Sequence, residues 1–447
     1  MLLPSLGTSI ANVALPAFAT AFAASFSDVQ WVVLSYLLAV TTLIVGAGRL
    51  GDLLGRRRLL LWGIGIFALA SAGAALAPNL WVLVAARVVQ GLGAAITMAL
   101  TVASVSDVVP EERTGSAMGL LGTISAVGTA LGPSLGGALL SWASWPAVFA
   151  VLAVAGAAAF LVGWRTLPSS PASKTRATSF DLPGMLLLAL SLGAYALSTT
   201  VGGAHFGLLN AGLAALSVAG FSAFVFVENR TRSPLVRIEL LRERGLGTGL
   251  VSLGLVSAIM MATLVVGPFY LSEALGLEPV QTGLVMSVGP GIAALVGLPA
   301  GRLVDYLGSS RVMTTGLIGL TIGTALMTVL PGWFGTAGYV GGLAVITAGY
   351  ALFQAANNTA VMAGATQDQR GLTSALLGLS RNLGLITGAS GIGAVFALGR
   401  RGFAPLGFAA GSGSGLQISF ALAAAFALGA TGLTFWAGGD RSARADH

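Results

Sequence analysis

The chain contains no cysteine and only 2 histidines among its 447 residues. The lack of cysteine excludes a disulfide, a thiolate metal ligand and a thiol nucleophile. His205 lies in a short loop between apolar runs and His447 at the end of the sequence, so neither is placed for a metal or a catalytic pair within an apolar run. We therefore expect no enzyme, no metal and no cofactor.

Charge is also scarce, since 8% of the residues are charged while 55% are hydrophobic and 64 are glycine. This composition lies far outside that of soluble globular proteins and predicts an all-α polytopic membrane protein. The net charge of +7 comes from arginines in short loops between apolar runs, so it is a topology signal and predicts no nucleic-acid partner. Met1 leads directly into an apolar run, so we expect a first span and no removable signal peptide.

Apolar runs of about 20 residues, the length that a helix needs to cross a bilayer, recur along the whole chain. They lack the alternation of barrel strands, which favours helices. We predict fourteen spans, near 2–24, 30–51, 59–77, 80–107, 115–140, 145–164, 183–201, 207–227, 246–272, 280–304, 312–331, 337–363, 371–398 and 415–437.

One polar stretch occurs twice. Residues 48–58 read GRLGDLLGRRR and residues 301–311 read GRLVDYLGSSR, and each copy lies between two apolar runs. A long-range repeat of this kind indicates two related halves. We predict an N-terminal six-helix bundle over 1–164, a linker with two extra spans over 165–244, and a C-terminal six-helix bundle over 245–447.

The distribution of arginines predicts the orientation of the chain. When the loop at 48–58 is placed in the cytoplasm, most lysines and arginines fall in cytoplasmic segments. The positive-inside rule then places both termini in the cytoplasm.

Four motifs resemble those of major facilitator superfamily transporters. They are IANVALP at 10–16, the loop at 48–58, RVVQG at 87–91 and GTALGPSLGG at 128–137. With fourteen spans, the set resembles the 14-spanner drug:proton antiporter branch. The resemblance implies the major facilitator fold, with two six-helix bundles around a central cavity, two inserted linker helices, and alternating access. It further implies a monomer that exports small molecules in exchange for protons, with the proton gradient as its energy source. The 21 arginines against one lysine, with abundant alanine and glycine, indicate a GC-rich bacterial genome and therefore a bacterial inner membrane.

The same resemblance implies a conformational switch in the repeated loop. Asp52 would dock on a helix start in the other half, and Arg56 would pair with Asp107 at the inner end of span 4. The sequence departs from this pattern twice: Leu53 stands where the family usually has a basic residue, and the second copy has Ser309 where the first has Arg56. The alternative is that these residues only stabilise a loop. The predicted switch residues are Gly48, Asp52, Gly55, Arg56, Asp107 and Asp305.

Span 4 carries a polar stripe, because Arg87, Gln90 and Thr97 share one helical face. A charge this far inside a span is costly in lipid and usually faces a cavity or a partner, so Arg87 is a candidate for substrate or proton handling. The alternative is that Arg87 snorkels outward or binds carbonyls of span 1. Helix-to-helix hydrogen bonds are the alternative for the neutral groups. The predicted cavity residues are Ser9, Asn12, Arg87, Gln90, Thr97, Tyr350, Gln354, Asn357 and Arg381.

Span 5 has small residues every four positions around a proline, a pattern that lets two helices pack closely and bend. By resemblance this is the antiporter motif, although packing alone explains it equally well. Its residues are Gly128, Gly132, Pro133, Gly136 and Gly137.

No acidic residue falls in the middle of any predicted span. Gly7 and Leu34 stand where many relatives have an acid, so Asp28 and Asp107 near the span ends are the possible proton carriers. A cavity with Arg87 and Arg381 and no central acid favours neutral or anionic amphiphilic substrates. A uniporter or importer without proton antiport remains the alternative.

Overall fold

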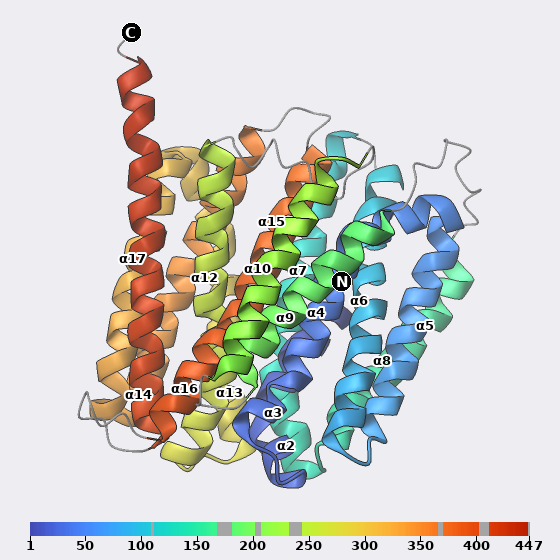
Figure 1. Cartoon of the computed structure of the whole chain (residues 1–447), viewed down its shortest axis with the longest axis vertical. Coiled ribbons are helices and arrows are strands. Elements are labelled where there is room, and N and C mark those ends of the chain that lie inside the picture. Colours follow the sequence, from blue (N-terminus) through green and yellow to red (C-terminus); the bar gives the residue numbers. More distant parts are fainter. Residues whose placement is uncertain are drawn as a thin grey trace. The chain divides into compact units, whose positions relative to one another are not determined.

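A computed structural model of the chain describes residues 1–108, 111–167, 181–201, 207–231, 244–364, 370–401 and 411–445. Some side chains within these ranges also lie outside the description, among them those of Gly48, Asp52 and residues 102–108. The regular structure of the described residues is helical throughout (Figure 1), which confirms the all-α prediction.

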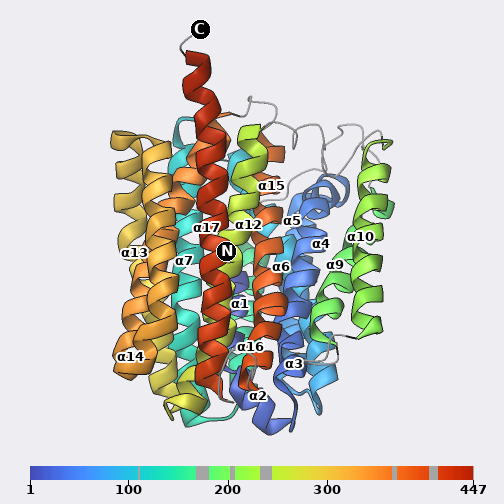
Figure 2. The same cartoon turned by 60° about the vertical axis from the view of Figure 1, so that its left-hand side comes forward.

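The chain divides into two compact units. Unit 1 comprises residues 1–201, 206–235 and 278–284. Its helices are α1 (Leu2–Val13), α2 (Leu15–Ala21), α3 (Phe26–Val29), α4 (Trp31–Leu54), α5 (Arg56–Ala75), α6 (Leu80–Val108), α7 (Glu111–Trp142), α8 (Pro146–Thr166), α9 (Leu182–Thr200) and α10 (Leu208–Glu228). The predicted inserted spans correspond to α9 and α10, which lie side by side as a hairpin in both views (Figure 2).

Unit 2 comprises residues 202–205, 236–277 and 285–447. Its elements are α12 (Arg244–Phe269), the π-helix η1 (Tyr270–Ala274), most of α13 (Pro279–Leu307), α14 (Ser309–Ala363), α15 (Arg370–Thr387), the π-helix η3 (Gly388–Ile392), α16 (Gly393–Arg400) and α17 (Ser412–Ala445). The division into bundle, linker and bundle with the boundaries given above stays a prediction.

The number of spans differs from the predicted one. In the described residues, 11 helices are long and apolar enough to cross a membrane, or 12 if α1 and α2 form one span bent by 57°. The bend lies at Ala14, just before Pro16, which has no amide hydrogen to continue the helix ladder. The predicted spans 312–331 and 337–363 both lie in α14, which kinks at Gly335. The count of fourteen therefore stays a prediction.

Both copies of the repeated loop form the same tight turn. α4 ends at Leu54 and α5 begins at Arg56, while α13 ends at Leu307 and α14 begins at Ser309. The single residue between the helices is glycine in each case, with φ of 88° at Gly55 and 82° at Gly308. Residues with a Cβ rarely adopt this backbone conformation, so the sequence repeat is also a repeat of local structure.

The repeat extends to the helices that follow each turn. In unit 1 the helices α5 and α6 cross closely, where the Gly93 Cα lies against the backbone of Gly63 and Phe67. In unit 2 the two arms of α14 cross in the same way, where Gly349 lies against Gly316 and Leu320. Small residues at such crossings let the two backbones approach within van der Waals contact.

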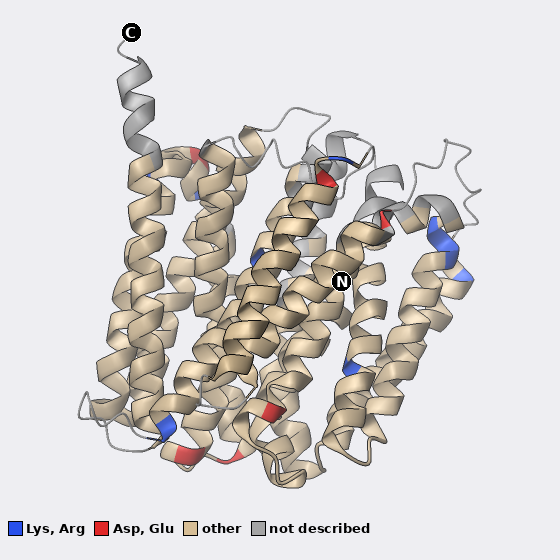
Figure 3. Cartoon of the chain, viewed as in Figure 1, with Lys and Arg blue, Asp and Glu red and all other residues tan. Residues whose placement is uncertain are grey.

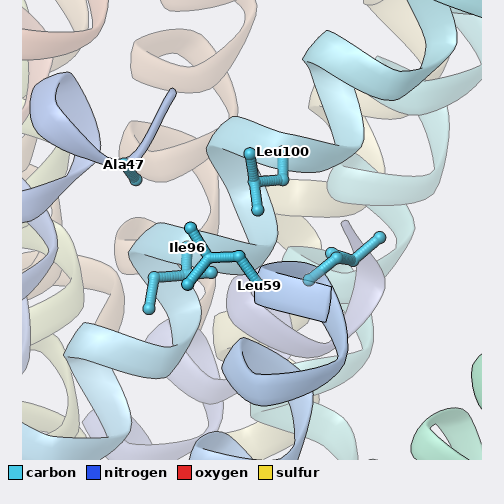
Figure 4. Packing of buried hydrophobic residues seen from close by; sticks show 5 residues of the cluster. Ala47, Leu59, Ile96 and Leu100 are labelled. Atoms are coloured by element: carbon cyan, nitrogen blue, oxygen red, sulfur yellow. The ribbon is translucent and has the colours of Figure 1, made fainter. Parts of the chain in front are cut away.

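An apolar cluster lies beneath the first turn. Ala47 of α4, Leu59 and Leu60 of α5, and Ile96 and Leu100 of α6 bury their side chains together (Figure 4). Beneath the second turn, Val304, Val312 and Ala356 form a smaller cluster from α13 and the two arms of α14. Each turn is therefore held by three packed helical segments of its own unit.

Charged residues are sparse along the helices. Figure 3 shows the helices mostly uncharged along their length, with most of the coloured acidic and basic segments near helix ends. This distribution is the one expected for helices that cross a bilayer.

Candidate functional site

Arg87 lies at the centre of a buried polar network in unit 1. Its side chain is 0% exposed. Nε donates to the backbone oxygen of Val32 in α4 at 2.9 Å, and Nη1 donates to that of Gly7 in α1 at 3.0 Å. Nη1 also donates to Oε1 of Gln90 at 2.6 Å, and the Tyr36 ring lies 4.1 Å from Cζ. Among the described residues no carboxylate bonds to this guanidinium, and Nη2 is buried without a partner there.

Gln90 extends this network to a fourth helix. Its Nε2 donates to the Ser71 hydroxyl of α5 at 2.6 Å, and Ser71 donates to the backbone oxygen of Phe67 at 2.6 Å. Arg87 and Gln90 therefore join α1, α4, α5 and α6. The sequence left open whether Arg87 handles substrate or protons, snorkels outward, or binds carbonyls of span 1. In this structure Arg87 bonds to the Gly7 oxygen of α1, which is a carbonyl of span 1. Neither Tyr36 nor Ser71 belongs to a recognisable motif, so their part in the network could not be predicted from the sequence.

The remaining predicted cavity residues of unit 1 bond mostly within their own helices. Thr97 donates to the Gly93 oxygen at 2.8 Å, and Asn12 Nδ2 donates to the Thr8 oxygen at 3.0 Å. The Asn12 oxygen Oδ1 is buried and accepts no hydrogen bond from the described residues. Ser9 donates to Ser5 at 3.1 Å, and its hydroxyl lies 3.3 Å from the Gly128 oxygen of α7.

The glycine motif of α7 forms a seam with α1. A Cβ at Gly128 would stand 2.7 Å from the Leu2 oxygen, and one at Gly132 would overlap Ser9. Gly136 lies against Ile10 one turn further along. The seam thus uses every fourth residue, as the spacing predicts. Pro133 lies within α7, and Gly137 faces the start of α13, near Pro279 and Gly283 of the same unit.

In unit 2, a second polar group lies on the last arm of α14. Gln354 Nε2 donates to the Tyr350 hydroxyl at 3.0 Å, and Arg381 of α15 lies within electrostatic range of this hydroxyl. These three side chains are half-buried. Asn357 on the same helix is 1% exposed, and both polar atoms of its side-chain amide lack partners among the described residues. The structure therefore brings four of the predicted cavity residues to neighbouring positions.

The structure describes only part of the predicted switch. The surroundings of Gly48 and the side chains of Asp52 and Asp107 lie outside what the structure describes. Arg56 is half-buried at the first position of α5, and Asp305 is exposed in the last turn of α13. The pairing of Arg56 with Asp107 stays a prediction.

Asp28, one of the predicted proton carriers, caps a short helix. Its carboxylate accepts a hydrogen bond from the Ser25 amide at 3.2 Å, and the Ser25 hydroxyl accepts one from the Asp28 amide at 3.2 Å. This reciprocal capping box explains an acid at this position without reference to transport. Its role as a proton carrier is not tested by this geometry.

Two buried acids beside the linkers were not identified from the sequence. Asp181 caps α9 by accepting from the Gly184 amide at 2.9 Å, and it is 4% exposed. Glu228 ends α10 and is 2% exposed. A Cβ at Gly184 would stand 2.5 Å from an oxygen of Asp181 and 2.6 Å from one of Glu228. Gly184 therefore makes room for two carboxylates at the open end of the hairpin.

The apolar helices and the repeated turn define a multi-pass helical membrane protein with two structurally related segments. The sequence matches the Major Facilitator Superfamily over residues 1–389. The chain therefore belongs to this superfamily of membrane transporters, which are not enzymes.

Individual relatives agree with this assignment. The chain is 30% identical to the riboflavin transporter RibZ of Clostridioides difficile, over 88% of this chain and 85% of RibZ. It is 32% identical to the multidrug resistance protein Stp of Mycobacterium tuberculosis, over 87% of this chain and 72% of Stp. The resemblance to the drug-efflux branch is thereby confirmed.

A solved structure confirms the fold. A bacterial homologue of the human lysosomal transporter Spinster superimposes with a TM-score of 0.70 at 16% identity, covering 98% of this chain and 94% of that one. This likeness concerns the fold alone.

Proposed function

We propose that this protein exports small amphiphilic compounds, neutral or anionic, by alternating access coupled to proton antiport. It acts as a monomer in a bacterial cytoplasmic membrane with both termini inside. The multidrug resistance relative Stp supports export, and the arginines in the short loops support the orientation. The ion that drives transport is the proton, and no cofactor takes part.

The substrate preference rests on the polar groups that the two units contain. The proposed cavity set is the predicted one, and its half-buried members are Tyr350, Gln354 and Arg381. A phenol, an amide and a guanidinium can hold a carboxylate, a phenolate or a neutral polar group, and the positive charge of the guanidinium disfavours a cation beside it. Arg87 is buried in this conformation, so its contribution to the cavity is to hold the surrounding helices in position.

A second candidate is transport without proton antiport. It is favoured by the contact between Arg87 and the Gly7 oxygen, because the resemblance implies an acid at position 7 and this chain has glycine there. The relative RibZ, a riboflavin transporter, also fits a carrier of one solute.

Substrate-driven proton movement in proteoliposomes distinguishes the two candidates. A pH dye is enclosed, and a panel of anionic, neutral and cationic amphiphiles is supplied outside. We expect substrate movement with counterflow of protons for the anionic and neutral compounds, and loss of the proton signal in Asp28→Asn or Asp107→Asn. Substrate movement without a proton signal would establish the second candidate, and transport of cations only would contradict the proposed substrate class.

A further inference from the structure

One surface of unit 1 combines cations with exposed aromatic side chains. It lies at the beginning of α5 and the end of α8, and we call it the α5/α8 surface, formed by Arg57, Arg58, Trp62 and Trp164. Trp62 is 52% exposed and Trp164 is 57% exposed. Figure 3 shows the basic residues gathered at this end of α5.

The two helices are antiparallel where they meet. Gly163 lies against Leu61, Phe160 against Gly65 and Gly156 against Ala68, so residue numbers rise along α5 as they fall along α8.

The side that each residue faces follows from this packing. Trp62 follows Leu61 by one position, and Trp164 follows Gly163 by one position. Arg58 lies four residues before Trp62, about one helical turn, and therefore shares its face. In an antiparallel pair of right-handed helices, these positions face the same side. Arg165, one residue further along α8, faces away from it.

Arg57 fixes the two helices at this level. Its Nε donates to the backbone oxygen of Leu167 at 2.8 Å, and its Nη2 donates to that of Trp164 at 2.9 Å. The end of α8 is therefore attached to the first turn of α5, and Trp164 is held beside the arginines. Arg58 lies over the Trp62 ring, with Cζ 5.1 Å from the ring centroid.

Among the side chains that the structure describes, no carboxylate bonds to Arg57 or Arg58. Neither α5 nor α8 contains an acidic residue. Gly55, which precedes α5, offers no side-chain cap, so three arginines add to the positive end of the helix dipole. An anionic group at this point is favoured by both the side chains and the first amides of α5.

We propose that the α5/α8 surface binds the headgroup of an anionic phospholipid. The phosphate lies between Arg57 and Arg58, and the two tryptophans take the depth of the headgroups, where indole rings are enriched in membrane proteins. The acyl chains lie along the exposed apolar side chains further along the pair, such as Leu69 at 76% exposure. This site is independent of the transported substrate and of proton coupling.

Native mass spectrometry of the purified full-length protein tests the proposal. The protein is equilibrated with equal amounts of phosphatidylglycerol and phosphatidylcholine, and the ratio of the two retained lipids is measured. Wild type is expected to retain phosphatidylglycerol preferentially. The double variant Arg58→Gln, Trp62→Leu is expected to lower this ratio by about fivefold.

Two further variants make the result specific. Arg165→Gln removes an exposed cation from the same end of α8 but from the side of that helix that faces away from α5, so its ratio is expected to equal that of wild type. Trp164→Leu leaves every charge in place and is expected to lower the ratio less than the double variant. An unchanged ratio in the double variant, or an equal loss in Arg165→Gln, would overturn the proposal. Circular dichroism shows whether each variant is folded.

Discussion

Arg87 donates a hydrogen bond to the backbone oxygen of Gly7 across 3.0 Å, from one transmembrane helix to another. A guanidinium buried at 0% exposure is costly to desolvate, and here main-chain carbonyls and the Tyr36 ring compensate it. The resemblance to the family also implies an acid at position 7, where this chain has glycine. The relationship between these two residues therefore links the packing of unit 1 to the question of proton coupling.

The first prediction places an acid beside this arginine. A Cβ at position 7 would stand 3.1 Å from the Phe67 ring and 3.7 Å from the Tyr36 hydroxyl, so a short side chain requires only a small shift of the ring. We expect Gly7→Asp to increase the number of protons moved per substrate in proteoliposomes. Arg87 favours the ionised carboxylate, so the new acid would take up a proton in the state that separates the two and release it in the state that brings them together.

Gly7→Asn is the matched control, since it has the same shape without a titratable group. It is expected to leave the proton count of wild type unchanged. Equal counts in the Asp and Asn variants would show that an acid at position 7 does not couple to transport.

The second prediction concerns the geometry that Arg87 requires. Arg87→Lys keeps the charge but cannot donate to Val32, Gly7 and Gln90 at once, because an ammonium is a compact point donor. Each buried group left without a partner costs about 1–3 kcal/mol, so we expect a clear loss of thermal stability in detergent. Arg165→Lys, at an exposed position in the last turn of α8, is expected to unfold as wild type does. A wild-type melting temperature for Arg87→Lys would contradict this account.

The helices and turns could be predicted because their signals are local. An apolar run predicts a span wherever it occurs, and glycine at 55 and 308 marks the repeated turn without reference to the rest of the chain. The face of α7 that packs on α1 also followed from its four-residue spacing, although the spacing does not reveal α1 as the partner.

The polar network could be predicted only in part. The spacing of Arg87 and Gln90 on one face was evident, but their partners Val32 and Ser71 come from other helices, and a carbonyl acceptor leaves no signal in the sequence. The two acids at Gly184 were missed for the same reason, since Asp181 and Glu228 meet only once α9 and α10 have folded into a hairpin.

The third prediction tests the seam between α1 and α7. A Cβ at Gly132 would stand 2.7 Å from the Ser9 Cβ and 2.8 Å from the Ile10 nitrogen, so the two helices must separate to admit it. We expect Gly132→Ala to destabilise the protein by about 1–3 kcal/mol, the usual cost of overpacking. Gly212→Ala, on an exposed face of α10 with open space around it, is expected to be neutral or stabilising by up to about 1 kcal/mol. Equal melting temperatures for the two variants would exclude a close seam at Gly132.

The fourth prediction separates the backbone of the repeated turn from its side chains. Nothing lies within 4 Å of a Cβ at Gly55 or Gly308, so alanine there meets no steric obstacle and acts only through the positive φ. Holding a residue with a Cβ in this region costs about 1–3 kcal/mol, and we expect Gly55→Ala and Gly308→Ala to lose similar stability in chemical unfolding. Gly73→Ala, in the regular part of α5 with the same free space, is the control without the backbone cost.

If both turns take part in alternating access, each variant should also slow substrate transport beyond what its loss of folded protein explains, because a strained turn favours one state over the other. Transport that falls only in proportion to the folded fraction would assign both turns to stability alone.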